Sequence, residues 1–329
     1  MDLKTEYLGL QLPHPFVVGA SPLMDDVGMA RRLEDAGAAA LVMRSLFAEQ
    51  IVREGVGAYA QSEDGRSSRA GSGFALPARS FVLSPDAYLE QLSTLKAALA
   101  IPVIASLSGS APGRWLEYAP LLESIGADAL ELNLHAGGTE VSRSSADIEA
   151  ALVETVRAVR AAVKMPVAVK LPPWFSGLAL LAEDIQDAGA DALVLFSRAP
   201  APDIDPEALG SVPPLALSRT TELPLRLRWL AILSCRLRIP LAATGGVHDE
   251  VAAIKALMAG ARVVQMVSAI LARGPGHLRD VRTAMAEWMG RHGYESIRSL
   301  RGTLDLQDCP DTAGYERATG ILALQRWPG

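Results

Sequence analysis

A phrase that returns four times along the chain restricts the possible folds more than any other feature. Each copy follows a helical pattern, contains Gly-Ala and leads directly into a short apolar run. Glycine is the residue expected just past a helix C-terminus, where the backbone adopts a positive φ, and alanine then lets the chain turn tightly into a buried strand. The four copies span residues 36–43, 126–132, 188–195 and 259–266.

A second phrase alternates with the first and consists of an apolar residue, a proline and another apolar run. It occupies residues 101–105, 165–169 and 239–243, with a looser copy at 14–18 that begins with His14. Proline at the first position of a strand ends the preceding helix and costs no ladder hydrogen bond. The apolar runs lack strict alternation, which is typical of parallel strands buried on both faces.

Together the two phrases predict eight strands, with helical patterns in most of the gaps. The strands are expected at about 15–20, 39–44, 102–107, 128–134, 166–171, 191–197, 239–244 and 262–267. The helical patterns span 26–36, 86–99, 114–125, 146–163, 177–188, 248–259 and 277–291. This alternation indicates an α/β protein with a (β/α)8 TIM barrel. An open doubly wound sheet is the alternative, and it is disfavoured because no GxGxxG follows the first strand.

We expect residues 1–329 to form a single domain, because TIM barrels often exceed about 250 residues. The barrel core should span about 14–292, with a C-terminal extension over 293–329 that packs outside the barrel. Three long loops follow the second, fourth and sixth predicted strands, at about 46–84, 135–145 and 197–225. All three leave the C-terminal ends of strands, where barrels build their active sites. The polar residues 61–73 in the first loop fit either a lid or a disordered insertion.

Composition excludes several classes of protein. The net charge is −6 and no basic cluster gathers on one face, so nucleic-acid binding is not expected. We interpret the Arg-rich stretch 226–238 as an amphipathic helix with a basic side in water. No apolar run is long enough to span a membrane, and no signal peptide is recognisable. Cys235 and Cys309 lack the spacing of a disulfide framework or metal site, which favours a cytoplasmic protein without a bound metal.

Two of the predicted strand ends indicate a phosphate site. Gly245 and Gly246 follow the seventh strand and open a helix, and Ser268 opens another helix after the eighth. Helix N-termini present free N–H groups to an anion, and barrels usually hold phosphate at the loops after these two strands. The simpler alternative is a glycine turn and a serine N-cap without a ligand.

Lys170 is the most informative single residue, because it interrupts an apolar strand. A buried lysine must reach an anion, so it either lies beside an electron-rich cofactor ring or forms a Schiff base with a carbonyl substrate. The alternative is a strand-end lysine that reaches water. Asn133 closes another apolar strand, where its amide either holds the polar edge of a ring or caps a loop.

Several strings resemble the dihydroorotate dehydrogenase family, which are barrels with FMN at their strand ends. The strings are Ala20-Ser21, Glu131-Leu132-Asn133, Val169-Lys170-Leu171-Pro172-Pro173 and Thr244-Gly245-Gly246-Val247. Residues 45–51, 202–205, 242–249 and 294–297 are similar to a bacterial branch called dihydroorotate dehydrogenase-like proteins. The resemblance covers almost the whole chain.

The resemblance implies a cofactor role for nine residues and a substrate role for two. The FMN-binding set is Ala20, Ser21, Ser45, Asn133, Lys170, Ser197, Gly245, Gly246 and Ser268. Within it, Lys170 would lie near the N1–O2 edge of the flavin and act catalytically, and Gly245, Gly246 and Ser268 would hold the phosphate. Arg44, in place of the usual lysine, and Asn133 would contact the substrate.

The chain departs from the family pattern at the position of the catalytic base. Soluble family members have Asn-x-Ser-Cys after the fourth strand, with the cysteine as base, whereas this chain has Asn133-Leu134-His135-Ala136. Ala136 cannot accept a proton. His135 is adjacent and is the remaining candidate for a catalytic base. Ser108 and Ser197 replace asparagines that are common in the branch, and Val267 replaces a glycine.

Three functions follow from these observations. The first is an FMN-dependent oxidoreductase, related to pyrimidine biosynthesis, that transfers hydride between flavin N5 and a CH–CH bond of a small ring substrate. Because Ala136 replaces the usual cysteine base, the substrate stays open between dihydroorotate and another ring. The second is a flavin-binding barrel without dehydrogenase activity, with an electron-transfer or scaffold role. The third is a phosphate-binding lyase or isomerase that uses Lys170. A homodimer and an electron-transfer partner protein are also expected.

Overall fold

The computed structural model describes residues 1–55, 83–135, 141–198, 203–207, 210–212, 216–309 and 311–325. Residues 61–73 and Ala136, which carried two of the predictions above, lie outside these ranges. Within the described ranges, no helix combines the length and the apolar character needed to cross a bilayer.

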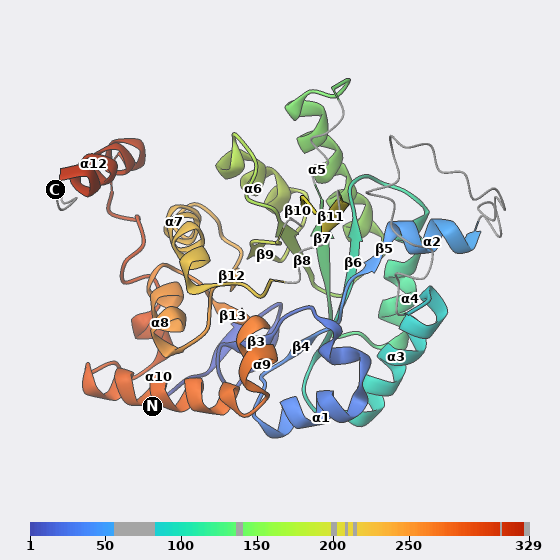
Figure 1. The fold of residues 1–329 in the computed structure, drawn as a ribbon, viewed down its shortest axis with the longest axis horizontal. Helices are drawn as coiled ribbons and strands as arrows, with labels where there is room; N and C mark the ends of the chain where they lie inside the picture. The colour runs from blue at the N-terminus through green and yellow to red at the C-terminus, as the bar shows by residue number, and fades with distance from the viewer. Residues whose placement is uncertain are drawn as a thin grey trace.

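Eight parallel strands close into a barrel, as predicted (Figure 1). Around the barrel the order is β3 (Phe16–Val18), β4 (Leu41–Val42), β6 (Val103–Gly109), β7 (Ala129–Leu134), β8 (Val167–Leu171), β9 (Ala192–Leu195), β12 (Leu241–Thr244) and β13 (Val263–Met266). β13 pairs with β3 and β4 pairs with β6, which closes the sheet. The short β5 (Leu46–Phe47) continues the second strand position along β6.

Helices surround the barrel and connect successive strands (Figure 1). They are α1 (Val27–Asp35), α3 (Pro85–Ala98), α4 (Tyr118–Ile125), α5 (Ser145–Ala162), α6 (Leu178–Asp187), α7 (Leu223–Leu233), α8 (Glu250–Met258) and α10 (His277–Arg291). Two shorter helices, α2 (Ala48–Gly55) and α9 (Ser268–Arg273), follow β5 and β13. In all four copies of the Gly-Ala phrase the glycine follows a helix and has a positive φ, between 87° and 109°. The (β/α)8 prediction is therefore confirmed, together with the reason for its repeat.

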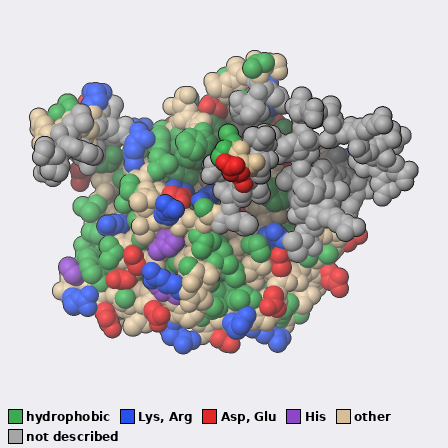
Figure 2. Space-filling view, in the orientation of Figure 1, with side chains coloured by type: hydrophobic (Ala, Val, Ile, Leu, Met, Phe, Trp, Pro, Cys, Tyr) green, Lys and Arg blue, Asp and Glu red, His purple; other side chains and the backbone are tan. Residues whose placement is uncertain are grey.

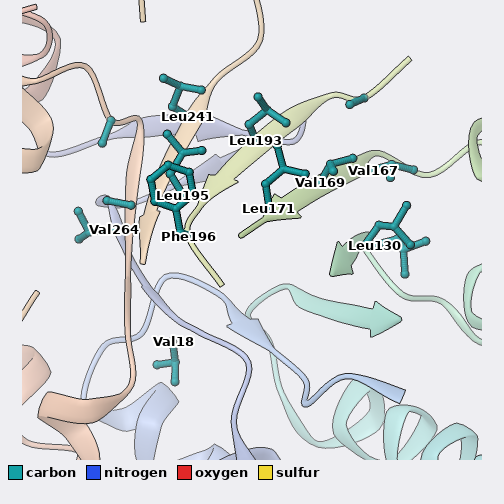
Figure 3. Close-up of a cluster of buried hydrophobic side chains, with 14 of the residues drawn as sticks. Val18, Leu130, Val167, Val169, Leu171, Leu193, Leu195, Phe196, Leu241 and Val264 are labelled. Carbon is teal, nitrogen blue, oxygen red and sulfur yellow. The ribbon is translucent and has the colours of Figure 1, made fainter. Parts of the chain in front are cut away.

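Side chains of each strand alternate between the helix layer and the barrel interior. In β8, Val167, Val169 and Leu171 belong to the large apolar cluster shared with the helices, part of which Figure 3 shows. Ala168 belongs instead to a second cluster inside the barrel. Lys170 shares the alternation of Ala168, so its side chain starts from the interior face of the strand.

An N-terminal hairpin was not predicted. β1 (Thr5–Tyr7) and β2 (Leu10–Leu12) pair antiparallel, and their buried residues Tyr7, Leu8 and Leu12 join the interior cluster. Because the cluster also contains Val263 and Ala129 from the first positions of two barrel strands, the hairpin covers the N-terminal end of the barrel. A second hairpin, β10 (Asp203–Asp205) and β11 (Gly210–Val212), lies in the long loop after β9.

The C-terminal extension lies outside the barrel and contains α11 (Ile297–Leu300) and α12 (Thr312–Gln325). Between these helices, the backbone N–H groups of Gly302, Leu304 and Leu306 donate to carbonyls of α7 and α8. α12 stands apart from the barrel at the C-terminus (Figure 1). On the face in Figure 2, positive and negative side chains are interspersed along the lower edge. The division into one domain stays a prediction.

Candidate cofactor site at the mouth of the barrel

A buried ion pair occupies the interior of the barrel. Lys170 Nζ lies 3.1 Å from Glu131 Oε1, and both side chains are almost fully buried. Gln265, from the opposite side of the barrel, donates from Nε2 to Glu131 Oε2 at 2.6 Å. A buried ion pair is tolerated only when further hydrogen bonds satisfy its remaining atoms. The three residues come from β7, β8 and β13 and together form a polar layer across the barrel.

The sequence predicted that Lys170 reaches an anion, but it did not identify Glu131 as that anion. A glutamate inside an apolar strand indicates a buried polar contact as strongly as a lysine does. The Glu131 side chain, like that of Lys170, lies on the interior face of its strand. The pairing also argues against a Schiff-base role, since the Nζ atom already donates to Glu131 in the barrel interior.

A pocket of about 240 Å³ extends from this polar layer over the C-terminal ends of β12 and β13. Five predicted residues line it, namely Ala20, Lys170, Gly245, Gly246 and Ser268. Residues that the sequence did not single out for a site complete much of the wall, namely Phe196, Arg198, Leu217, Ser218, Thr244 and Gln265. The closed ring of strands therefore brings Lys170 and the predicted phosphate residues, Gly245, Gly246 and Ser268, into one pocket.

The glycine pair forms a tight turn that does not itself begin the helix. Gly245 and Gly246 have φ values of 85° and 80°, and α8 begins four residues later with Asp249 as its cap. A Cβ atom on Gly246 would lie 2.7 Å from the backbone nitrogen of Leu223. Glycine is required here because the backbone at the start of α7 approaches so closely. Ser268 does begin a helix, as predicted, although α9 has only six residues.

Ser218 connects the two halves of the predicted phosphate site. Its backbone N–H donates to Ser268 Oγ at 2.9 Å, and its own Oγ accepts from the Gly246 N–H at 3.3 Å. The same hydroxyl lies 3.3 Å from Nε2 of His248. Ser218 stands in a long loop with no periodic pattern, and for this reason the sequence gave no signal for it.

Arg226 lies behind the glycine turn. Its Nε donates to the Thr244 carbonyl at 2.9 Å, and its Nη1 donates to the Glu222 carbonyl at 2.8 Å. Burial lowers the pKa of Arg226, and the nearby Glu222 carboxylate opposes that shift. The prediction that the 226–238 helix turns its arginines to water is therefore wrong for Arg226, which is 5% exposed.

Three buried polar atoms near the mouth have no hydrogen-bond partner in the described part of the chain. They are Ser21 Oγ, Asn133 Oδ1 and Gln265 Oε1. A buried polar atom without a partner costs about 1–3 kcal/mol, so such atoms indicate a missing ligand. Ser21 and Asn133 were predicted to contact the flavin, whose ring edge carries both donors and acceptors. The residues present therefore fit a polar, planar ring with a phosphate.

The remaining predicted residues surround the same mouth. Ser45 lies between β4 and β5, and its Oγ is 2.8 Å from the Oγ of Ser106 in β6. Arg44 Nη1 lies 2.8 Å from Asp25 Oδ2. Burial raises the pKa of Asp25, and Arg44 opposes the shift. The neighbouring Asp26 instead caps α1, where its side chain accepts from the Gly28 N–H.

His135 follows β7 and stacks on Phe47 with ring centroids 6.3 Å apart. Burial lowers the pKa of His135, the Lys170 charge adds to this, and Glu49 opposes it. A neutral imidazole is the form that can accept a proton. Ser197 follows β9, is buried and donates its backbone N–H to the Leu171 carbonyl. Neither residue lines the 240 Å³ pocket.

The pocket, the buried cation and the unpartnered atoms define a class, a (β/α)8 barrel that holds a phosphorylated cofactor across its mouth. A profile of the dihydroorotate dehydrogenase family matches residues 82–289. The chain is 29% identical over 301 residues to the catalytic subunit of dihydroorotate dehydrogenase B (NAD+) of Methanosarcina acetivorans, which covers 89% of this chain and 93% of that protein. It is 30% identical over 227 residues to the protein of the same name from Pyrococcus abyssi, which covers 66% and 73%.

The chain belongs to the dihydroorotate dehydrogenase family. Members of this family are FMN-dependent oxidoreductases, so the expected family, enzyme class and cofactor are confirmed.

Proposed function

We propose that this protein transfers hydride between FMN and a CH–CH bond of a small ring substrate, and that Ala136 at the position of the usual cysteine base favours a ring other than dihydroorotate. The observation that carries the proposal is the pocket that joins Lys170 and Gln265 to Gly245, Gly246 and Ser268. The backbone of the glycine turn, Ser218 and Ser268 would hold the phosphate. Bound there, FMN would supply the hydride acceptor at N5.

The chain's own residues prepare the electrostatics of the site. The Lys170 ammonium, at the inner end of the pocket, would stabilise negative charge on a bound ring. Glu131 holds this ammonium in place, and Gln265 fixes the second oxygen of Glu131. This leaves Gln265 Oε1 and Asn133 Oδ1 as acceptors for N–H groups of a bound ring.

The substrate side rests on Arg44, Asn133 and His135. Arg44 is a fixed cation, because Asp25 holds its guanidinium at 2.8 Å. An acidic or carbonyl-bearing ring is therefore the best match. His135, held neutral by burial, is the group proposed to accept the proton in place of the missing cysteine.

The M. acetivorans and P. abyssi relatives are named catalytic subunits of an NAD+-linked enzyme. We therefore propose that an electron-transfer partner protein reoxidises the flavin of this chain. A homodimer and a cytoplasmic location remain predictions.

Cofactor binding is tested with the absorbance spectrum of protein loaded with FMN and then desalted. The wild type should retain flavin bands, and Gly246→Ala should lose at least about tenfold in FMN affinity, since the new Cβ would collide with Leu223. Gly126→Ala is the matched control, because Gly126 also has a positive φ but its Cβ would meet no atom within 4 Å. Equal FMN retention in both variants would refute the assigned phosphate turn.

Substrate choice is tested with the FMN-loaded protein and dihydroorotate. We expect no flavin reduction by dihydroorotate in the wild type and measurable reduction in Ala136→Cys, which restores the residue of the soluble family members. Rapid flavin reduction by dihydroorotate in the wild type would disprove the substrate proposal while leaving the cofactor proposal intact. Failure to reduce the flavin with any ring substrate or electron donor would favour the flavin-binding barrel without dehydrogenase activity.

A further inference from the structure

A second large pocket lies at the end of the barrel opposite the cofactor site. Arg262 immediately precedes β13 and lines this pocket, whereas Ser268 follows β13 and lines the cofactor pocket. The volume of the second pocket is about 550 Å³. Its wall is polar and consists of Asp2, Lys4, Thr5, Glu6, Gln11, Arg262, Ser296, Arg298 and Arg301.

Three arginines in this wall have no side-chain partner among the residues that the structure describes. Arg262, Arg298 and Arg301 make no ion pair and no side-chain hydrogen bond with any residue that the structure describes. Other half-buried or buried arginines, such as Arg160 and Arg226, each pair with a carboxylate. Three guanidinium groups gathered in one wall, with no ion pair to a described carboxylate, are unusual in a chain whose net charge is −6.

The surroundings of these arginines disfavour their charged forms. Burial lowers the pKa of Arg262, the charge of Arg298 lowers it further, and Glu6 opposes the shift. Burial also lowers the pKa of Arg301, and both Arg262 and Arg298 add to that shift. The three cations therefore repel one another, and an anion between them would relieve the repulsion.

The carboxylates of the wall do not neutralise the arginines. Asp2 Oδ1 accepts from the Lys4 backbone N–H at 3.1 Å, and Glu6 Oε2 accepts from Gln11 Nε2 at 3.1 Å. Neither carboxylate lies within 4 Å of an arginine nitrogen in the described structure. Lys4 adds a fourth cation, so the four cations outnumber the two carboxylates.

We propose that this pocket binds a small phosphate-bearing molecule. The guanidinium fork matches the spacing of phosphate oxygens and keeps its positive charge at any physiological pH, so three such groups suit a phosphate. A cavity of 550 Å³ holds more than a single phosphate. Thr5, Gln11 and Ser296 supply hydroxyl and amide groups for the remainder of the ligand.

Apart from Arg262, the residues that line the pocket come from the N-terminal segment 2–11 and from residues 296–301 of the C-terminal extension. The Asp2 backbone forms an isolated parallel bridge with Ser296, and Ile297 N donates to Asp2 O at 2.9 Å. A ligand that contacts Lys4 and Arg301 would therefore fasten the N-terminal segment to the extension. Binding should raise the midpoint of thermal unfolding, because the ligand binds only the folded state.

The experiment is calorimetric titration of the FMN-loaded protein with pyrophosphate at about 0.15 M NaCl, near physiological ionic strength. We expect saturable binding that weakens as salt is added. Arg301→Gln and Arg298→Gln should each reduce the affinity by at least about tenfold, the loss expected for one charge-assisted hydrogen bond. Arg298 is exposed, so its substitution tests the pocket even if Arg301→Gln impairs folding.

Arg291→Gln is the matched control, because Arg291 is an exposed arginine of α10 that pairs only with Glu287. Its pyrophosphate affinity should equal that of the wild type. Flavin fluorescence is followed in the same samples to exclude binding at the cofactor site. Absence of saturable binding, release of flavin by pyrophosphate, or unchanged affinity in both pocket variants would each overturn the proposal.

Discussion

At the scale of single residues, the site depends on polar side chains placed inside an otherwise apolar barrel. The sequence identified Lys170, Asn133 and Ser21, because each interrupts or ends an apolar strand. It did not identify Glu131 or Gln265 as site residues, although both lie on the same interior alternation. Partners across a barrel are separated by up to 134 residues, as for Glu131 and Gln265, and no local pattern encodes that distance.

The interior ion pair predicts a strongly coupled response to substitution. Glu131→Leu should lower the free energy of unfolding by about 3–5 kcal/mol, because it leaves the Lys170 charge buried without a partner. Adding Lys170→Met should recover most of the loss, since two apolar side chains replace two charges. Urea unfolding of the FMN-free protein measures both effects.

An exposed ion pair serves as the control. Asp187→Ala removes the partner of Arg238, and both side chains of that pair are more than half exposed, so the change should stay within about 0.5 kcal/mol. Additive effects of Glu131→Leu and Lys170→Met would contradict the predicted coupling.

His14 makes stability dependent on pH. Burial lowers the pKa of this histidine from 6.5 to about 4, and the nearby Arg282 adds to the shift. Below pH 6.5 the unfolded chain binds a proton at this position and the folded chain does not. The contribution of His14, at most about 3 kcal/mol, is therefore present above pH 6.5 and lost as the pH falls toward 4.

His14→Gln should flatten the fall in unfolding free energy between pH 6.5 and 4 relative to the wild type. The measurement is urea unfolding at intervals across this range. His292→Gln is the control, because His292 is exposed. An identical pH dependence in His14→Gln and the wild type would rule out this histidine as the cause.

At the scale of elements, the two repeated phrases predicted all eight barrel strands. Most of the predicted strands were too long: the range 39–44 became β4 at 41–42, because the ladder of a tilted barrel pairs only part of an apolar run. β6 is the exception, since it extends to Gly109, beyond the predicted end at 107. The hairpin of β1 and β2 was missed, since three-residue strands show no period. α7 was recognised as a helix, but the burial of Arg226 depends on the glycine turn of another element.

The hydrogen bond from Arg226 to the Thr244 carbonyl suggests that α7 supports the turn at Gly245 and Gly246. Arg226→Met removes the donor to the Thr244 carbonyl and should weaken FMN binding by about tenfold, because the turn that follows loses its support. Arg228→Met on the exposed side of the same helix should leave the FMN affinity unchanged. The measurement is a fluorescence titration of both variants with FMN. Equal FMN affinities of the two variants would show that the turn does not depend on Arg226.

At the scale of the whole molecule, the sequence predicted the barrel, the family and the end of the barrel that carries the site. It could not predict the 550 Å³ pocket, whose walls come from residues near 2–11 and near 296–301. Segments so far apart in the chain meet only after the barrel has closed.

We expect two truncations of the C-terminal extension to change the unfolding midpoint by different amounts. A chain that ends at Cys309 should keep its unfolding midpoint within about 2 °C, because it loses only α12 and the flanking residues. A chain that ends at Gly293 should lose at least about 5 °C, since it removes the buried Ile297 and Leu300 and the backbone bonds to α7 and α8. Differential scanning calorimetry compares the two, and equal midpoints would contradict the prediction.

The two phrases alternate strictly around the closed barrel. Strands entered through proline are β3, β6, β8 and β12, and each is followed around the ring by a strand entered through Gly-Ala. The barrel is thus four similar quarters, the pattern that duplication of a two-strand unit leaves behind. Because Asp2 already lies beside Ser296, the beginning and end of the ring are adjacent. A circularly permuted chain that starts between two quarters would leave each quarter whole.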